Sequence, residues 1–502
     1  MEKIKVVSAK SMTKIEGIAY TQGCHELEFM ENAGISIACY VEIFIQNSKL
    51  DPVVTLLVGK GNNGGDAYVA GLKLLLKGFR VTAFHLYPMD SCSPLCRHQK
   101  ERFEGAGGVV NFVQSGFLPS FGLKGVLLDG LVGTGFKGSA EGLLAEVIRA
   151  ANLSSLPILS IDIPSGLCGN TGAVGSVAIQ ATSTIYLELP KVGFFLGEGW
   201  NHVGVLVKGE FGLSSDLLSQ VKPEAVLVNR EDPQLRFLST IKRSRNKYDA
   251  GYVLTIAGSV SMTGAGILSS YAALRSGAGI VRWFYPPEIE LLITSTPWEI
   301  IKEPLHHLGR LSEEMKRAKA LLMGPGMGRD KGAKKQIKEA LSKCKIPLII
   351  DADALFFLAN NPSFEIPSQA ILTPHAGEMK RLLEAHNLFN EPLLEGVQEF
   401  VNRKKATVLL KGAPNFLFTP GEVPLILPFG NPGMATAGMG DVLSGLLASL
   451  LAQGLSPAKA AIIGCYVHGV AGDLAASKKG FFGLTASDVL ESLPEALSLN
   501  SF

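Results

Sequence analysis

Residues 52–66 read PVVTLLVGKGNNGGD, and this stretch predicts the fold class. Residues 52–58 are an apolar run of strand length, as expected for a strand that is buried on both faces. A glycine-rich turn follows at residues 59–65, and apolar residues then recur at helical spacing over residues 66–77. A buried strand, a tight turn and a helix form the repeating unit of a parallel α/β sheet that is covered by helices.

The same alternation continues along most of the chain. Further buried strands are predicted at residues 80–86, 126–129, 157–162, 252–257, 320–323, 347–351, 370–373 and 407–410, and further helices at residues 264–276, 441–453 and 457–474. The alternation weakens between residues 211 and 247, which include a polar, proline-containing segment and a basic cluster typical of a solvated linker. We therefore predict two α/β domains, residues 1–222 and residues 223–502.

Composition and charge limit the class of protein. Hydrophobic residues make up 47% of the 502 residues and charged residues 18%, which excludes a mainly disordered chain. The net charge of +2 argues against a nucleic-acid partner. The N-terminus lacks an apolar stretch of signal-peptide length, and seven cysteines, an odd number, do not suggest a disulfide framework. One of the two longest uncharged runs, residues 250–274, contains Gly, Ser and Thr throughout, so we expect a cytoplasmic protein without a membrane partner.

In the first half, glycine-rich and acidic sequence follows three predicted strands. Asn62-Asn63-Gly64-Gly65-Asp66 precedes a helix, where backbone N–H groups and the helix N-terminus favour an anion. Asp129 ends a second strand and precedes Gly133-Thr134-Gly135, and Asp162 ends a third strand and precedes Ser165. Buried acids at strand ends are costly unless they are paired, hydrogen-bonded or metal-bound. Asp66 taken alone is also consistent with a helix cap, but oxygen donors on three loops indicate a ligand and cation site.

Together with Pro190-Lys191-Val192-Gly193, these motifs resemble the NAD(P)H-hydrate epimerase domain over about residues 1–220. The resemblance implies a Rossmann-like, three-layer αβα fold that interconverts the R and S epimers of hydrated NADH or NADPH. It implies acid–base chemistry by Asp162 with help from Lys191, and a potassium ion (K⁺) held by Asn63, Asp129 and Ser165. Besides Asp162, the residues implied to contact the hydrated cofactor are Asn62, Asn63, Gly64, Gly65, Asp66, Gly133, Thr134, Gly135, Phe136, Lys137, Gly138 and Ser139. Ala67 stands where the family usually has glycine, which a helix tolerates.

The second half carries its own set of loops after predicted strands. They lie at residues 324–328, 351–353, 373–378, 411–415 and 431–441. The last of them, NPGMATAGMGD, opens a long helix, and a glycine-rich turn in that position presents N–H donors to a transferring phosphoryl group. Asp441 at the helix start is suited to accept a hydroxyl proton. Its alternative role is that of a helix-capping carboxylate.

Gly438-Met439-Gly440-Asp441 resembles the anion hole and catalytic base of ribokinase-like kinases, and the whole set resembles one branch of them, the ADP-dependent NAD(P)H-hydrate dehydratases. The order of the two domains is that of the bacterial bifunctional nicotinamide nucleotide repair family. The resemblance implies a ribokinase-like αβα domain that phosphorylates the S epimer from ADP with Mg²⁺; loss of phosphate then restores the ring double bond and leaves AMP. The implied contacts are Ala265, Gly326, His375 and Asp441 for the hydrated cofactor, and Lys411, Gly412, Ala413, Pro414, Asn415 and Gly440 for the nucleotide.

Two departures from the family pattern and two other functions stay open at this point. Pro414-Asn415 stands where the nucleotide loop typically ends in Thr, so a hydroxyl contact is missing and the nucleotide preference stays open. Asn246-Lys247-Tyr248 stands where many members have His-Lys-Gly, which leaves open whether Lys247 has the geometry to reach a phosphate. His375 is also consistent with a structural histidine. The alternative functions are a ribokinase-like small-molecule hydroxyl kinase with an accessory N-terminal domain, and a binding scaffold of the kind found in mRNA decapping. Retention of both loop sets favours the bifunctional enzyme, which we expect to be a homo-oligomer.

Overall fold

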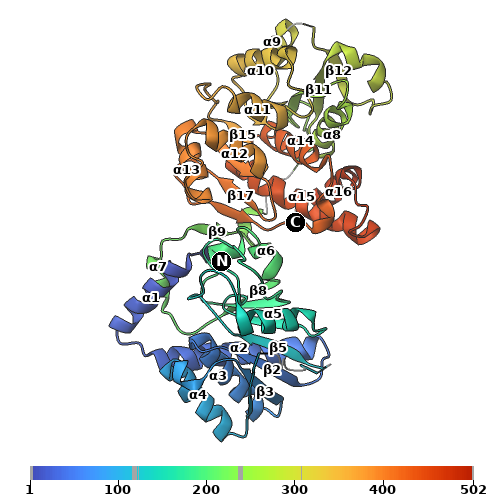
Figure 1. Ribbon diagram of the computed structural model, residues 1–502. Helices are drawn as coiled ribbons and strands as arrows, with labels where there is room; N and C mark the ends of the chain where they lie inside the picture. Colours follow the sequence, from blue (N-terminus) through green and yellow to red (C-terminus); the bar gives the residue numbers. More distant parts are fainter. Residues whose placement is uncertain (1–3, 116–120, 123, 236–240, 307, 500–502) are drawn as a thin grey trace. The chain divides into compact units, whose positions relative to one another are not determined.

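The computed structural model describes residues 4–115, 121–122, 124–235, 241–306 and 308–499 (Figure 1). The chain divides into two compact units, an N-terminal unit Ile4–Val226 and a C-terminal unit that begins at Leu227. The boundary predicted after residue 222 lies in the segment that follows helix α7 (Ser215–Gln220), shortly before this division. The short strand β9 (Ala225–Leu227) spans it.

The N-terminal unit is built on a parallel sheet in the order β4-β3-β2-β5-β6-β7-β8. Its strands are β2 (Val53–Val58), β3 (Arg80–His85), β4 (Val109–Phe112), β5 (Val126–Gly130), β6 (Ile158–Ile161), β7 (Ser183–Leu187) and β8 (Val205–Gly209), and a further short strand is β1 (Ile4–Val6). Its helices are α1 (Ala9–Thr21), α2 (Glu26–Asn47), α3 (Asn62–Leu76), α4 (Pro94–Gly105), α5 (Gly142–Leu153), α6 (Gly199–His202) and α7, with 3₁₀ turns at Met89–Ser91 and Val192–Phe194.

Successive residues of the central strands point to opposite faces of this sheet, and each face has its own apolar core. Leu56 and Leu128 pack with buried residues of α2, α3 and α4, whereas their neighbours Leu57 and Leu127 pack with α5. The unit is therefore a three-layer αβα domain, as predicted. The chain leaves β2 toward β3 on one side and returns to β5 on the other, so the order of the strands reverses at β2 and β5.

Helix α3 begins earlier than the sequence predicted, at Asn62 rather than at residue 66. The asparagine and glycine residues of the motif therefore form the first turn of the helix and not a separate loop. Glycine is required there by close packing, since a Cβ on Gly64 would lie 2.3 Å from the carbonyl oxygen of Gly59 and a Cβ on Gly65 would lie 2.6 Å from Met30. The cap residue of α3 is Gly61, so Asp66 is not a helix cap.

The C-terminal unit has a sheet in the order β18-β17-β16-β15-β14-β13-β10-β11-β12, in which β17 and β18 are antiparallel to their neighbours and the others are parallel. Its strands are β10 (Tyr252–Ile256), β11 (Ile280–Tyr285), β12 (Ile301–Pro304), β13 (Ala320–Met323), β14 (Leu348–Ile350), β15 (Ala370–Leu372), β16 (Thr407–Leu410), β17 (Asn415–Phe418) and β18 (Leu425–Leu427). Its helices are α8 (Thr263–Arg275), α9 (Leu308–Met315), α10 (Lys331–Lys343), α11 (Ala352–Ala359), α12 (Ala376–Ala385), α13 (Leu393–Lys404), α14 (Met439–Ala452), α15 (Pro457–Lys479) and α16 (Ala486–Ser498), with 3₁₀ turns at Pro233–Leu235, Pro287–Ile293 and Pro432–Met434.

This sheet also lies between two layers of helices. Residues of α8, α14, α15 and α16 form one large apolar core with the strands, and α10 to α13 lie on the other side (Figure 1). Helix α15 is long and apolar enough to cross a membrane by length and composition, but 61% of its most apolar window is buried inside the structure. Its buried residues belong to this core. All strands predicted from the sequence form, with their ends shifted by at most one residue.

Candidate active sites

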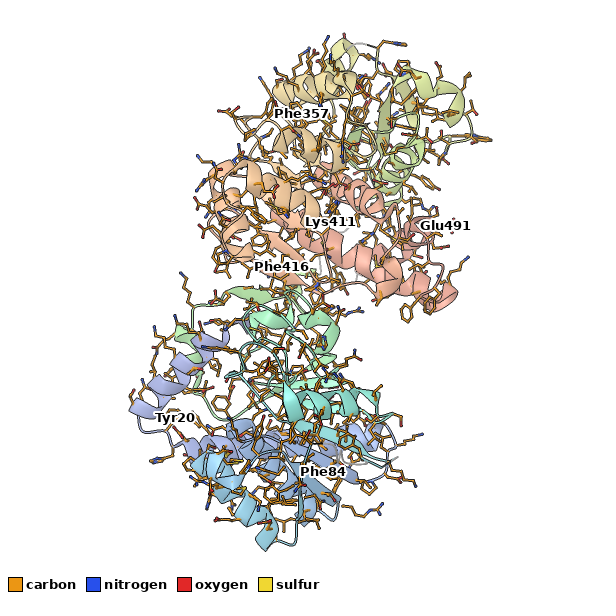
Figure 2. All side chains as sticks on the ribbon, in the orientation of Figure 1. Tyr20, Phe84, Phe357, Lys411, Phe416 and Glu491 are labelled. Carbon is orange, nitrogen blue, oxygen red and sulfur yellow. The ribbon has the colours of Figure 1, made fainter. Side chains whose placement is uncertain are left out.

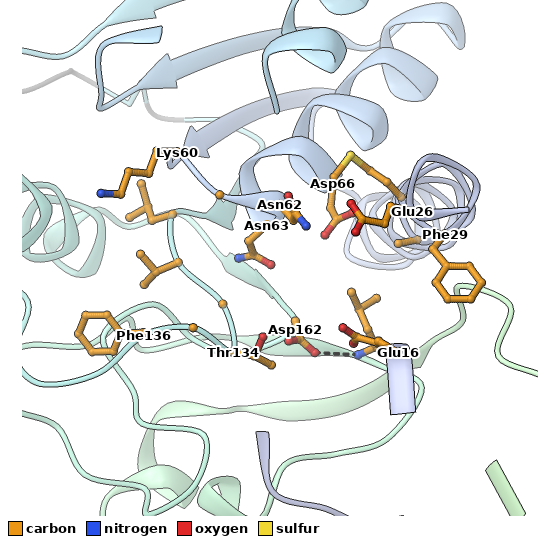
Figure 3. A pocket seen from close by; sticks show the side chains of 18 of the residues that line it. Glu16, Glu26, Phe29, Lys60, Asn62, Asn63, Asp66, Thr134, Phe136 and Asp162 are labelled. Carbon is orange, nitrogen blue, oxygen red and sulfur yellow. Dashed lines mark hydrogen bonds between the residues drawn. The ribbon is translucent and has the colours of Figure 1, made fainter. Parts of the chain in front are cut away.

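A cavity of about 610 Å³ lies at the carboxyl ends of β2, β5 and β6 in the N-terminal unit (Figure 3). This is the point at which the strand order reverses, where open α/β sheets bind ligands, and the volume is typical of a small-molecule site. The predicted contact residues that line it are Asn62, Asn63, Asp66, Gly133, Thr134, Gly135, Phe136, Lys137 and Asp162. The fold thus brings the three predicted segments to one cavity.

The other predicted contact residues of this unit, Gly64, Gly65, Gly138 and Ser139, do not line the cavity. Gly64 and Gly65 form the tight packing of α3 described above. Gly138 and Ser139 pack against the loop at Gly175, where an added Cβ would lie 2.7 Å from both residues. Their contact with a substrate stays a prediction, whereas their packing role is visible in the structure.

Asp162 and Lys191 form a buried ion pair at the edge of the cavity. Asp162 directly follows β6 and has a left-handed backbone (φ 61°). Its carboxylate accepts hydrogen bonds from Lys191 Nζ and, at 3.2 Å, from the backbone N–H of Leu187. Lys191 is fully buried and also donates to the carbonyl of Leu187 at 3.3 Å. The ion pair with Lys191 and the hydrogen bond from Leu187 fix the position of the Asp162 carboxylate at the edge of the cavity.

The residues predicted to hold K⁺ lie close together beneath the same cavity. Asp129 is fully buried and accepts from Ser165 Oγ at 2.5 Å, Ser165 N at 2.9 Å and Ser160 Oγ at 2.8 Å. Burial raises the pKa of Asp129, and the hydrogen bonds from Ser165 and Ser160 oppose that rise. Within the described residues, no basic side chain pairs with this carboxylate. Asn63, beside Gly133, has a buried amide nitrogen without an acceptor in the described part of the chain.

The cavity also contains residues that the sequence analysis missed. Glu16 and Tyr20 come from α1, Glu26 from the start of α2, and Lys60 and Tyr87 from the loops after β2 and β3. Burial, followed by the charge of Asp162, raises the pKa of Glu16 to about 7. Burial is the largest cause that raises the pKa of Asp66 well above its usual value, and the negative charges of Asp162 and Glu16 add to it. Helix α1 carries no motif, so no sequence signal assigns Glu16 to this site.

In the C-terminal unit, the predicted loops meet around Asp351 and Lys411. Asp351, at the start of α11, accepts from Lys411 Nζ at 2.8 Å, Ser444 Oγ at 2.6 Å and Ala352 N at 2.9 Å. Burial lowers the pKa of Lys411, but the carboxylates of Asp351, Glu378 and Asp441 together more than offset this, so the pKa is raised and the lysine stays charged. Figure 2 labels Lys411 in the interior of the C-terminal unit.

Asp441 lies in the first turn of α14, after Gly438 in the left-handed conformation (φ 88°). Gly438 is the cap residue of the helix, so Asp441 is not the cap. Burial and the nearby charge of Asp351 raise the pKa of Asp441 to about 6, and Lys411 lowers it. Lys411 also lies beside Gly440, since a Cβ added there would be 3.3 Å from its Nζ.

The structure brings the remaining predicted residues of this unit together in pairs. Gly326 has a positive φ of 61°, and a Cβ added to it would lie 2.9 Å from the side chain of Ala265. His375 pairs with Lys411 in a short parallel bridge and is the cap residue of α12, where its Nδ1 accepts from Gly377 N at 3.0 Å. His375 therefore has a structural role of its own, and its exposed ring places the second nitrogen, Nε2, 3.6 Å from Glu378 Oε1.

The two departures from the family pattern lie in different surroundings. In the predicted nucleotide loop 411–415, Asn415 Oδ1 accepts from Gly412 N at 3.1 Å, so the residue in place of Thr closes the loop on itself. Lys247 lies over the ring of Tyr248 and lines a separate hollow of about 360 Å³ with Arg282 and Arg317.

One buried histidine in this unit was also missed. His468 of α15 has a ring nitrogen without a partner in the described residues, and burial lowers its pKa to about 4, so it is neutral. A backbone hydrogen bond links it to Met439, two residues before Asp441. The predicted sequence pattern of α15 contains only a helical apolar period, which gives no sign of this contact.

Comparisons with known proteins agree with this two-site arrangement. Residues 26–193 match the family described as YjeF-related protein N-terminus, and residues 253–495 match the family described as NAD(P)H-hydrate dehydratase. A bifunctional NAD(P)H-hydrate repair enzyme of Moorella thermoacetica is 34% identical over 98% of this chain and 96% of its own length, and one of Escherichia coli is 34% identical over 87% and 84%. A crystal structure of a ribokinase-like superfamily protein from Enterococcus faecalis is similar with a TM-score of 0.50 and 26% identity, covering 55% of this chain and 96% of that one. The chain belongs to the family of bifunctional NAD(P)H-hydrate repair enzymes.

Proposed function

We propose that the N-terminal unit interconverts the R and S epimers of hydrated NADH or NADPH and that the C-terminal unit dehydrates the S epimer with ADP, giving the intact dinucleotide, AMP and phosphate. The observation that carries the proposal is a charged lysine–aspartate pair at the strand ends of each unit, Asp162–Lys191 and Asp351–Lys411. Relatives that match nearly the whole chain are named as repair enzymes, which favours this function over a kinase with an accessory domain.

In the N-terminal site, the substrate carbon to be inverted bears a hydroxyl and the ring nitrogen. Asp162, held as a carboxylate by Lys191, is the base that removes the hydroxyl proton. The first turn of α3 and the segment after β5 supply backbone N–H groups and the side chains of Asn62 and Thr134 for the rest of the dinucleotide.

In the C-terminal site, Asp441 accepts the hydroxyl proton of the hydrate while that oxygen attacks the terminal phosphorus of ADP and the bond to AMP breaks. The amide groups at the start of α14 and the ammonium of Lys411 stabilise the phosphoryl charge. Loss of the phosphate ester, with removal of a ring proton, then restores the double bond. Mg²⁺ bound to the nucleotide would neutralise phosphate charge, and because Asp351 is already bound by Lys411 and Ser444, we expect the phosphates to supply most of its ligands.

The donor set beneath the N-terminal cavity fits K⁺. Asp129 is a buried carboxylate without a basic partner in the described residues, and Asn63 and Ser165 add neutral oxygens. Exchange of amide oxygen and nitrogen in Asn63 would turn its unpaired buried nitrogen position into an acceptor for a cation. A bound K⁺ would supply positive charge to the floor of the cavity.

The test is one incubation of the full chain with a mixture of hydrated NADH epimers. With ADP and Mg²⁺, the NADH absorbance should recover completely and AMP should form in equal amount, because the R epimer is converted and then consumed. Without ADP, the two epimers should interconvert with no recovery of absorbance. If the NADH absorbance recovers only by the amount of S epimer present, the epimerase activity is refuted. If a stable phosphorylated product accumulates, the dehydratase activity is refuted.

A further inference from the structure

The epimerisation assigned to the N-terminal unit needs a proton donor as well as a base. Removal of the hydroxyl proton turns the C–O bond into a carbonyl only if the carbon–nitrogen bond breaks, and its electron pair then moves to the ring nitrogen. Protonation of that nitrogen makes it a better leaving group. Asp162, paired with Lys191, is the base, so in an opening where both proton transfers occur together the nitrogen draws its proton from a second acidic group beside Asp162.

Glu16 is the group in the right place. It lines the cavity, and Figure 3 shows its carboxyl on the same side of the cavity as Asp162, with Asn62, Asn63 and Asp66 across from both. The hydroxyl and the ring nitrogen are attached to the same carbon, so an acid and a base that serve them must be neighbours. Asp66, although its pKa is also raised, lies on the wrong side for this task.

Helix α1 holds Glu16 firmly against the rest of the unit. Met12, Ile15 and Ala19 lie on the face of α1 that packs into the core of the N-terminal unit. The N-terminus of the helix is fixed by Ser8, whose side chain accepts from Ser11 N, and by Asn170, which accepts from Ala9 N at 2.8 Å. Glu16 is therefore placed by packing, and in the described residues no hydrogen bond or ion pair is formed by its carboxyl.

The surroundings keep Glu16 protonated for part of the time at neutral pH. Asp162 and Lys191 face it from the loops after β6 and β7, Glu26 from the start of α2, Asp66 from α3 and Tyr20 from the next turn of α1. Burial is the largest cause of its raised pKa of about 7, Asp162 adds to it and Lys191 opposes it. A carboxylic acid that titrates near the working pH is suited to give and take a proton.

We infer that Glu16 is a further catalytic residue, the acid that works with Asp162 to open and close the hydrated ring. Asp162 takes the hydroxyl proton, the carbonyl forms, the carbon–nitrogen bond breaks, and the nitrogen takes the proton of Glu16. The open aldehyde rotates, the nitrogen attacks its other face and returns the proton to Glu16, and the new alkoxide takes the proton back from Asp162. Both residues end in their starting states, so the cycle needs no water and no further proton carrier.

This inference rests on the proposed epimerase function, and the experiment separates the two. The full chain is compared with Glu16→Gln, Glu16→Asp and, as a matched control, Glu28→Gln, an exposed acid on α2 that does not line the cavity. Each is assayed for epimerisation of hydrated NADH without ADP and for dehydration of the S epimer with ADP. Glu16→Gln should lose about 10²-fold in epimerisation and nothing in dehydration, Glu16→Asp should regain part of the loss, and Glu28→Gln should match the unchanged chain.

The pH dependence and an oxygen label sharpen the test. An acid must carry its proton, so epimerisation by the unchanged chain should fall as pH rises through about 7, and this fall should be absent in Glu16→Gln. During short incubations in heavy-oxygen water, ring opening should give epimerised product that is mostly unlabelled. Absence of epimerisation in the unchanged chain would refute the proposed function itself. Normal epimerisation by Glu16→Gln, or one labelled oxygen for every inversion, would refute the inference.

Discussion

Each active site contains a lysine–aspartate ion pair, but the pair has a different role in each site. In the N-terminal unit, Lys191 binds Asp162, the proposed base, so the lysine fixes the charge of the reacting group itself. In the C-terminal unit, Lys411 binds Asp351, and the proposed base Asp441 is left without an ion pair in the described residues and has a pKa raised to about 6.

The difference follows from the role that each reaction requires of its lysine. Epimerisation moves protons on a small ring and creates no large anion, so the lysine is best used to hold the base ionised. Phosphoryl transfer spreads negative charge over phosphate oxygens, and there a lysine near Gly440, at the start of α14, is best used as a counter-charge. Asp351 then serves to hold Lys411 in position, with Ser444 supporting it.

The largest effect is expected for Asp162→Asn. The amide keeps the shape of the side chain but cannot act as a base, so epimerisation should fall on the order of 10³-fold. Dehydration of the pure S epimer should be unchanged, and a mixture of epimers with ADP should recover only the absorbance of its S fraction on the time scale of the assay. Equal loss of both activities would show that the two units do not work as separate sites.

The mirror change is Asp441→Asn, with a loss of dehydration of about 10²-fold or more because the hydroxyl proton has no acceptor. Epimerisation, measured without ADP, should continue at the rate of the unchanged chain. Asp330→Asn is a suitable control, because Asp330 is a helix-capping residue of α10 in the same unit. If Asp441→Asn still releases phosphate and AMP at the normal rate, the base is another residue.

The two lysine pairs should also differ in their effect on stability. Lys191→Met leaves Asp162 buried without its counter-charge, which typically costs about 3–5 kcal/mol. Lys411→Met should cost less, about 1–3 kcal/mol, because Asp351 keeps the hydrogen bonds from Ser444 and Ala352.

Thermal unfolding of the single variants, and of Lys191→Met combined with Asp162→Asn, measures these costs. The double variant has no unpaired charge and should be more stable than Lys191→Met alone. The view that the unpaired charge of Asp162 causes the loss of stability would be contradicted by either of two results. One is an equal loss of stability in Lys191→Met and Lys411→Met, and the other is a double variant less stable than Lys191→Met.

The strands predicted from the sequence all form, because a doubly covered parallel sheet leaves long apolar runs and glycine-rich turns, but the sequence analysis did not predict β1, β4, β7, β8, β9, β11, β12, β17 and β18. It predicted the start of α3 less well, since asparagine and glycine are common in turns, whereas here close packing against Gly59 and Met30 draws them into the helix. It missed Glu16 and His468 for a different reason. Each lies on a helix without a motif, and only tertiary packing brings Glu16 to the cavity and His468 to Met439 at the start of α14.

The smallest expected effect concerns the pH dependence of dehydration. Asp441 must be ionised to act as a base, and burial together with Asp351 raises its pKa to about 6, so kcat/KM should fall as pH decreases through that value. Between pH 7.5 and pH 5.5 the ionised fraction drops about fourfold, and the rate should follow it. Asp351→Asn removes a negative charge that raises the pKa of Asp441, so the fall in kcat/KM should move to lower pH. If Asp441 were instead paired directly with Lys411, the substitution would cause no such shift. A flat profile from pH 5.5 to 7.5 in the unchanged chain would mean that Lys411 holds Asp441 ionised as Lys191 holds Asp162, and the contrast between the two sites would be lost.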